Sequence, residues 1–155
     1  MRIGVISDNH GNLPQQALEL LQGVEEIIHA GDIGRPEIIT RLESIAPVRA
    51  VVGNMDRGGA LARRYPETLS FSVDSCHIFV RHEGWKPRIW SQRLPEPRPD
   101  VAICGHSHRA LLEEYEGVLY LNPGTAGQAR FGHGLSLAIL TIEGGKPRAE
   151  VIPFE

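Results

Sequence analysis

The chain opens with the apolar run Ile3-Gly4-Val5-Ile6-Ser7, and the polar triplet Asp8-Asn9-His10 follows it at once. A short run of this kind, rich in β-branched residues, predicts a buried β-strand. Open α/β sheets place their ligand sites in loops at the carboxyl ends of strands. This opening stretch therefore predicts both a central strand and the first side chains of a site.

Similar short apolar runs recur along the chain and predict a fold that is built mostly from strands. They are rich in Val and Ile and are bounded by Gly, Pro or Asp, which is typical of strands. The expected strands are residues 3–7, 26–29, 48–52, 69–73, 77–81, 101–104, 111–114, 118–121, 135–142 and 149–152.

The order of strands and helices predicts two kinds of sheet. Helical patterns at residues 14–22 and 36–44 separate the first three strands, which favours parallel pairing there. The last third of the chain has strand after strand with tight turns at 116–117 and 144–145, which favours antiparallel pairing. We therefore expect an α/β protein with two sheets that are flanked by helices.

Composition limits the class of protein. The 155 residues predict a single domain over residues 1–155. With 16 basic and 19 acidic residues, a formal net charge of −3, the chain has no basic excess for nucleic acid or an anionic membrane surface. Two cysteines cannot form a disulfide framework, and no signal peptide or bilayer-spanning stretch is present. These features predict a cytoplasmic location.

Polar side chains follow five of the expected strands, each at the point where the strand ends. Asp, Asn and His are recurrent metal ligands, and a set without thiolate suits Mn, Fe, Zn, Ni or Co better than Mg or Ca. Seven ligands exceed the need of one ion, whereas two divalent ions about 3.5–4 Å apart would use them all. We expect two ions, with manganese preferred. The candidate ligands are Asp8, His10, Asp32, Asn54, His82, His106 and His108.

In that order, these motifs resemble the signature of calcineurin-like metallophosphoesterases over residues 3 to about 130. The turn at residues 122–125, together with Arg130, is similar to that of the small single-domain bacterial and archaeal phosphodiesterases. The resemblance implies a β-sandwich of two mixed sheets with helices outside, in four αββα layers. It also implies that Asp32 bridges two metals. The first metal would be held by Asp8, His10, Asp32 and His108, and the second by Asp32, Asn54, His82 and His106.

The chain departs from the family pattern at three places. Met55 stands where the wider family has a histidine that assists the leaving group, although the small phosphodiesterases also lack it. A second aspartate is missing after Asp32, and Glu83-Gly84 follows His82 where Gly-His is common.

The resemblance implies a phosphodiesterase that hydrolyses a small-molecule phosphodiester. The nucleophile would be a metal-bridging hydroxide, so no side chain is assigned as catalytic. Substrate contacts are expected from Asn54, Arg57 and Arg130. The alternatives are a phosphomonoesterase and a non-catalytic scaffold, the role of the retromer subunit that shares this fold. The oligomeric state stays open.

The remaining candidate residues have simpler interpretations. His29 is expected to pack in the interior, and Cys104 to behave as a small apolar side chain. Asp56 fits either a turn or the orientation of a ligand imidazole. Trp85 and Trp90 are expected to pack in the core or at an interface, with a base-stacking wall as the alternative.

Overall fold

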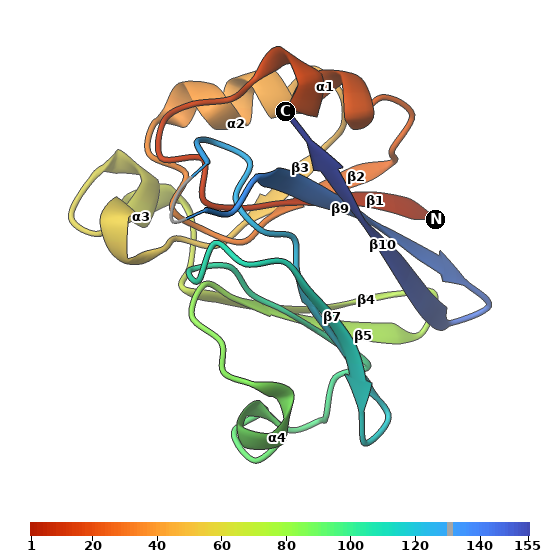
Figure 1. Ribbon diagram of the computed structural model, residues 1–155. Coiled ribbons are helices and arrows are strands. Elements are labelled where there is room, and N and C mark those ends of the chain that lie inside the picture. The colour runs from red at the N-terminus through yellow and green to blue at the C-terminus, as the bar shows by residue number, and fades with distance from the viewer. Residues whose placement is uncertain (130–131) are drawn as a thin grey trace.

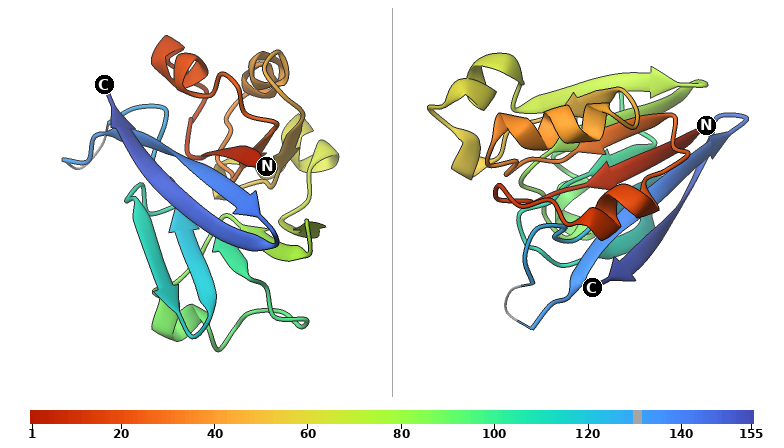
Figure 2. Two further views of the ribbon diagram at one scale, coloured as in Figure 1. Left: turned by 90° about the vertical axis from the view of Figure 1, so that its right-hand side faces the viewer. Right: turned by 90° about the horizontal axis from the view of Figure 1, so that it is seen from above.

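Two five-stranded β-sheets pack face to face in the computed structural model, which describes residues 1–129 and 132–155 (Figures 1 and 2). Helices α1 and α2 lie on the outer face of one sheet, and α4 lies against the outer face of the other (Figure 1). The layers are therefore helix, sheet, sheet and helix, as the family resemblance implied.

The first sheet has the strand order β10-β9-β1-β2-β3. Strand β1 pairs with β2 and β2 with β3 in parallel, because α1 and α2 return the chain to the same end of the sheet. Strand β9 pairs antiparallel with both β1 and β10. The bounds are β1 Arg2–Ile6, α1 Gln15–Leu20, β2 Glu26–His29, α2 Pro36–Glu43, β3 Val48–Ala50, β9 Leu135–Glu143 and β10 Lys146–Phe154.

The second sheet has the order β4-β5-β6-β8-β7. Its outer pairs, β4 with β5 and β7 with β8, are antiparallel hairpins, whereas β6 pairs in parallel with both β5 and β8. The bounds are η1 Asn54–Asp56, α3 Ala60–Arg64, β4 Thr68–Val73, β5 Cys76–Arg81, α4 Pro87–Trp90, β6 Val101–Ile103, β7 Leu111–Tyr115 and β8 Val118–Asn122.

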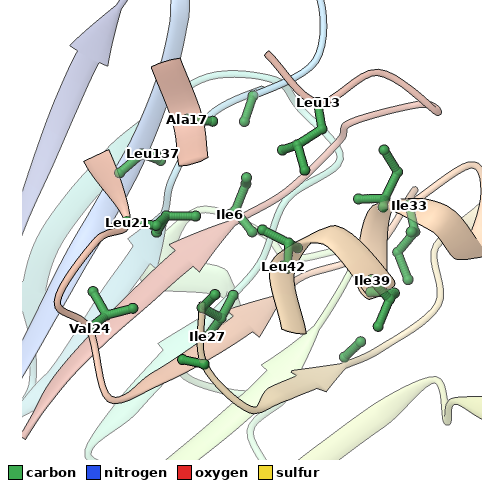
Figure 3. Close-up of a cluster of buried hydrophobic side chains, with 14 of the residues drawn as sticks. Ile6, Leu13, Ala17, Leu21, Val24, Ile27, Ile33, Ile39, Leu42 and Leu137 are labelled. Carbon is green, nitrogen blue, oxygen red and sulfur yellow. The ribbon is translucent and has the colours of Figure 1, made fainter. Parts of the chain in front are cut away.

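Strand β1 lies between two hydrophobic layers because its side chains alternate between the two faces of the sheet. Ile3 and Val5 join the core between the sheets, where they meet side chains such as Ile28 and Ile103. Ile6 faces the other way, into the cluster beneath α1 and α2 (Figure 3). Burial on both faces explains why the opening run is almost continuously apolar.

The expected strands are all present, and the differences lie in their bounds and in the short helices. Strand β10 extends over Lys146–Phe154, well beyond residues 149–152, because every residue from 146 to 154 pairs with β9. Its prolines at 147 and 153 are tolerated because β10 is an edge strand. Helix α1 is shorter than residues 14–22. Three short helices, η1, α3 and α4, were not predicted, because three to five residues are too few to show a helical period.

No helix in the described residues is long and apolar enough to cross a membrane. The two cysteines, Cys76 and Cys104, are both free and buried.

The core between the sheets provides a test of the packing. We expect Ile28→Ala to lower the free energy of unfolding by about 2–5 kcal/mol, because it leaves a cavity where both sheets meet. Urea unfolding of the metal-free protein measures this change. Leu112→Ala is the matched control, since Leu112 is 42% exposed on β7 and should change stability little. Equal effects of the two substitutions would contradict the assignment of Ile28 to the core.

Candidate metal centre

Five loops that follow strands meet at one rim of the sandwich and carry the candidate ligands. They follow β1, β2 and β3 in the first sheet, and β5 and β6 in the second. Within each group the strands run in parallel, so their carboxyl ends lie at the same edge of the sheet. Both sheets therefore contribute side chains to one site.

The structure brings six of the seven predicted ligands into two adjacent clusters. In the first, one ligand atom from each of Asp8, His10 and His108 lies within 4.8 Å of the others. Asp32, His82 and His106 form the second cluster by the same measure. The two groups match the residues assigned to the two metals, apart from Asn54 and the bridging role of Asp32.

Asp32 belongs to the second cluster and borders the first. Its Oδ2 atom is 3.2 Å from Nε2 of His82 and 3.7 Å from Nε2 of His10. One carboxylate oxygen therefore reaches an imidazole of each cluster, as a bridging ligand must. The other oxygen, Oδ1, accepts a hydrogen bond from the backbone N–H of Met55 at 2.9 Å, which holds the carboxylate in place.

The protonation of His82 shows what this cluster can bind. Its Nδ1 donates to the carbonyl of Ala30 at 2.8 Å, and a carbonyl can only accept. In the neutral ring the lone pair is therefore on Nε2, which faces the carboxylate of Asp32. Burial would lower the pKa of His82, but its contacts with Asp32 and Asp8 raise it overall. The Nε2 atom in this position binds either a proton or a cation. Histidines that bind metals through one ring nitrogen commonly donate the N–H of the other to a backbone carbonyl, as His82 does.

Asp8 gives a second indication of a cation site. This carboxylate is fully buried, and burial raises its pKa above the ordinary value despite the nearby His82. Oδ2 accepts hydrogen bonds from Ser7 and from the N–H of His106, whereas Oδ1 has no hydrogen-bond partner among the described residues. Oδ1 instead lies 3.4 Å from Nε2 of His108 and 3.7 Å from Nε2 of His10. A buried acceptor oxygen that faces ring nitrogens fits a metal ligand.

The backbone at these ligands is unusual. Positive φ angles occur at Asp8 (57°), His10 (49°), Asp32 (55°), His106 (71°) and His108 (63°). Residues other than glycine rarely adopt this conformation, and such residues concentrate at functional sites. These backbone turns bring the side chains of the candidate ligands into the two clusters. The amino-acid sequence alone does not show backbone angles of this kind.

Asp56 fastens two of the ligand loops together. Its carboxylate accepts hydrogen bonds from the backbone N–H groups of Gly53, Ile33 and Gly34, at 2.9, 3.1 and 3.0 Å. The loop that carries Asp32 is thus tied to the loop that carries Asn54. Of the two interpretations of Asp56, the structure supports the turn, because the groups that donate hydrogen bonds to its carboxylate among the described residues are all backbone N–H groups.

Close approach of the loops requires glycine at two positions. A Cβ atom at Gly53 would collide with the carboxylate of Asp32, and one at Gly105 would collide with the side chains of Ser7 and Asp8. The glycines before Asn54 and His106 are therefore part of the site, in addition to being turn residues.

The turn at residues 122–125 donates hydrogen bonds to two of the loops that carry ligands. Thr125 donates from its hydroxyl to the carbonyl of Asp8 at 2.9 Å. The amide nitrogen of Asn122 donates to the carbonyl of Gly105 at 3.0 Å and to the hydroxyl of Ser107 at 3.1 Å. The sequence showed this turn only through the family resemblance, and the structure gives its physical role.

The predicted substrate contacts lie beside the second cluster. Asn54 and Arg57 line a cavity of about 140 Å³ together with His82. Arg57 is exposed and pairs with Glu67 at 3.8 Å. Arg130 lies outside the described residues.

The departures from the family pattern have local explanations. A Cβ atom at Gly84 would lie 2.8 Å from both Cys104 and Trp90, so the packing here excludes a histidine at this position. Met55 is 66% exposed and contributes its backbone N–H to Asp32. Arg35, where the second aspartate is missing, donates to the carbonyl of Gly11 at 2.8 Å.

His29, Cys104 and Trp90 pack in the interior, as expected. His29 is fully buried, and its Nδ1 accepts from the N–H of Gly31 at 3.1 Å. The proton is therefore on Nε2, which donates to Oδ1 of Asn9 at 2.8 Å. Cys104 and Trp90 belong to the cluster between α4 and the second sheet. Sequence reasoning missed the supporting residues Ser7 and Asn9, because neither carries a recognisable motif.

Comparison with known proteins agrees with this geometry. Residues 1–145 match the calcineurin-like phosphoesterase superfamily domain. A probable metallophosphoesterase of Methanothermobacter thermautotrophicus is 37% identical over 98% of this chain and 92% of its own length. A phosphodiesterase of Methanocaldococcus jannaschii is 30% identical over 80% of this chain and 83% of its own.

Solved structures show the same fold. An archaeal phosphodiesterase superposes with a TM-score of 0.80 and 28% identity over 98% of this chain and all of its own. Vps29 of Chaetomium thermophilum superposes with a TM-score of 0.81 over 99% of this chain and 97% of its own, at 21% identity, which establishes a shared fold alone. The protein is a metallophosphoesterase by fold and candidate site. The chain belongs to the calcineurin-like phosphoesterase superfamily, whose members use divalent metals.

The role of Asp56 leads to a stability prediction. We expect Asp56→Ala to lower the free energy of unfolding by about 3 kcal/mol or more, because three backbone N–H groups lose their acceptor in a largely buried region. Asp56→Asn keeps one acceptor oxygen and should lose less. Glu150→Ala, an exposed acidic residue on β10, is the control for lost charge. Urea unfolding of the three variants without metal gives the comparison, and a cost for Asp56→Ala no larger than for Glu150→Ala would refute the role.

His29 leads to a prediction about pH. Burial lowers its pKa from an ordinary 6.5 to about 3, so the folded protein keeps this ring neutral at pH 5 whereas the unfolded chain protonates it. This histidine therefore reduces stability progressively as the pH falls from 6.5 towards 3. Nitrogen-detected NMR of the metal-free protein at pH 5 should show a neutral ring with the proton on Nε2. The same residue in urea-unfolded protein should be charged, and a charged ring in the folded state would contradict the assignment.

Proposed function

We propose that this protein is a dinuclear-metal phosphodiesterase. The observation that carries the proposal is the arrangement of ring nitrogens around Asp8 and Asp32, including the Nε2 of His82 that its backbone hydrogen bond turns towards Asp32. Asp8, His10 and His108 would hold one ion, and His82, His106 and Asn54 the other, with Asp32 bridging both. The named phosphodiesterase among the relatives supports the choice of a diester substrate.

Two divalent ions bound there would stabilise charge on the phosphoryl oxygens and lower the pKa of a bound water. The overall reaction consumes one water and breaks one P–O ester bond, which gives a phosphomonoester and an alcohol. Asn54 and Arg57 lie beside His82 and can donate hydrogen bonds to the phosphate oxygens. Arg130 is proposed as a further contact. The thioether of Met55 cannot donate a proton to the leaving group.

Manganese is the proposed metal, because the clusters combine imidazole and carboxylate without thiolate. We also propose a cytoplasmic, single-domain enzyme. The free, buried cysteines are compatible with a reducing compartment.

The two alternative functions are less well supported. A non-catalytic scaffold has no need of intact ligands, yet all seven positions carry metal-binding side chains and six of them lie in the two clusters. A phosphomonoesterase would be served by an imidazole at position 55, where this chain has an exposed methionine.

Metal removal tests the proposed activity. We expect chelation to reduce the hydrolysis of bis(p-nitrophenyl) phosphate by at least about a hundredfold, because the ions would supply several kcal/mol of transition-state stabilisation. Manganese should restore most of the activity. His82→Ala should behave like the chelated protein. His77→Ala should behave like the parent, because His77 is an exposed histidine on β5, the strand that precedes His82. Full activity in protein shown to be metal-free by elemental analysis would exclude the mechanism.

A second prediction concerns position 55. Met55→His should raise hydrolysis of phosphomonoesters relative to diesters, because a poor alcohol leaving group gains most from a positioned acid. We expect a modest rise of a few fold, below the roughly 10²–10⁴ of an optimised acid, since an exposed side chain at residue 55 is not held in position by packing. The measurement is the monoester-to-diester ratio of kcat/KM at equal metal content, with Met55→Gln as the control. An unchanged or lower ratio would mean that residue 55 does not face the leaving group.

A further inference from the structure

A second cavity lies beside His106. Glu83 lines the cavity that contains Asn54 and Arg57, and the next residue, Gly84, lines this second one. Its volume is about 350 Å³, within the range of small-molecule pockets. Gly84, Trp85, Cys104 and Leu111 line it, and His106 borders it. Because His106 belongs to the second metal cluster, a group in this cavity would lie next to the proposed reaction site.

The walls of this cavity are largely apolar and are held in position. The indole of Trp85 has the guanidinium groups of Arg81 and Arg93 at 5.1 and 4.8 Å from its ring centroid. Cys104 is free and buried among apolar side chains, where it acts as a small apolar surface. Gly84 must stay without a side chain, because a Cβ atom there would press on Cys104.

Two cations complete the lining. Lys86 and Arg109 both line the cavity, and neither has a salt bridge to an acidic residue among the described residues. Both side chains are donors only. The surrounding segment, residues 81–109, contains six basic and three acidic residues in a chain whose formal net charge is −3. The segment that supplies most of the lining thus carries a net positive charge, and two of its cations, Lys86 and Arg109, line the cavity itself.

We propose that this cavity binds the nucleobase of a nucleotide phosphodiester, which rests on the proposed function. A nucleobase is flat and apolar on its faces and carries acceptor atoms on its edge, so it matches apolar walls with donor-only cations at the rim. Guanine offers two adjacent acceptors, O6 and N7, that Arg and Lys bind well. A lipid chain has no acceptors for Lys86 and Arg109, and a sugar has little apolar surface for Trp85 and Leu111.

The test compares two p-nitrophenyl diesters that differ in the base. Guanosine 5′-(p-nitrophenyl phosphate) should have a kcat/KM at least about tenfold above that of the base-free ribose 5-(p-nitrophenyl phosphate), the effect of one good base contact. Lys86→Gln and Trp85→Leu should each reduce this ratio by about tenfold or more, which corresponds to the same contact. Arg88→Gln is the matched control, since Arg88 is an exposed basic residue of α4 that does not line the cavity.

A binding measurement separates this inference from the proposed activity. Guanosine 5′-monophosphate added to metal-free protein should shift the NMR signal of the Trp85 indole N–H, and ribose 5-phosphate at the same concentration should not. If neither diester is hydrolysed, the proposed function fails, and the Trp85 shift still decides what the cavity binds. Hydrolysis of both diesters at equal kcat/KM, or no difference between the two ligands at Trp85, would overturn the inference.

Discussion

The burial of the Asp8 carboxylate at the end of β1 is the constraint on which the rest of the site depends. Asp8 is fully enclosed, and its oxygens face Ser7, the backbone of His106, and the rings of His10 and His108. A carboxylate in such a place is stable in its charged form only when positive charge or hydrogen-bond donors compensate for lost water. The fold supplies hydrogen-bond donors to one oxygen of this carboxylate, Oδ2. A bound cation would supply the positive charge that the other oxygen needs.

Both sheets contribute ligands to this candidate centre. The first sheet contributes Asp8, His10, Asp32 and Asn54 from three parallel strands, and the second contributes His82, His106 and His108 from two. Neither sheet holds a complete cluster, because Asp8 and His10 meet His108, and Asp32 meets His82 and His106. Packing of the sheets through one apolar core is therefore a condition for metal binding, and damage to the core should weaken the site at a distance.

Residues 82–90 connect the candidate metal centre to the second cavity. His82 faces the metal cluster, Gly84 packs against Cys104 and Trp90, and Trp85 lines the cavity beside His106. The short helix α4 (Figure 1) anchors this segment through Trp90, and this side chain is 1% exposed. A side chain at residue 84 would disrupt the packing of Gly84 against Cys104 and Trp90. The same packing therefore excludes a histidine at residue 84 and forms part of the wall of the apolar cavity.

The sequence alone determined the strands, the parallel pairing of the first three, the antiparallel hairpins of the last third and the candidate ligands. Burial on both faces makes strands such as β1 continuously apolar, and ligands follow strand ends. The parallel pairing of β6 with β8 was not predicted. It did not determine the short helices, the backbone hydrogen bonds of Asp56, or the positive φ angles of five ligands. These features depend on contacts between residues far apart in the chain, such as Asp8 with His106 and Thr125 with Asp8. Only the packed sandwich decided which side chains meet, since local propensity carries no information about partners about 100 residues away.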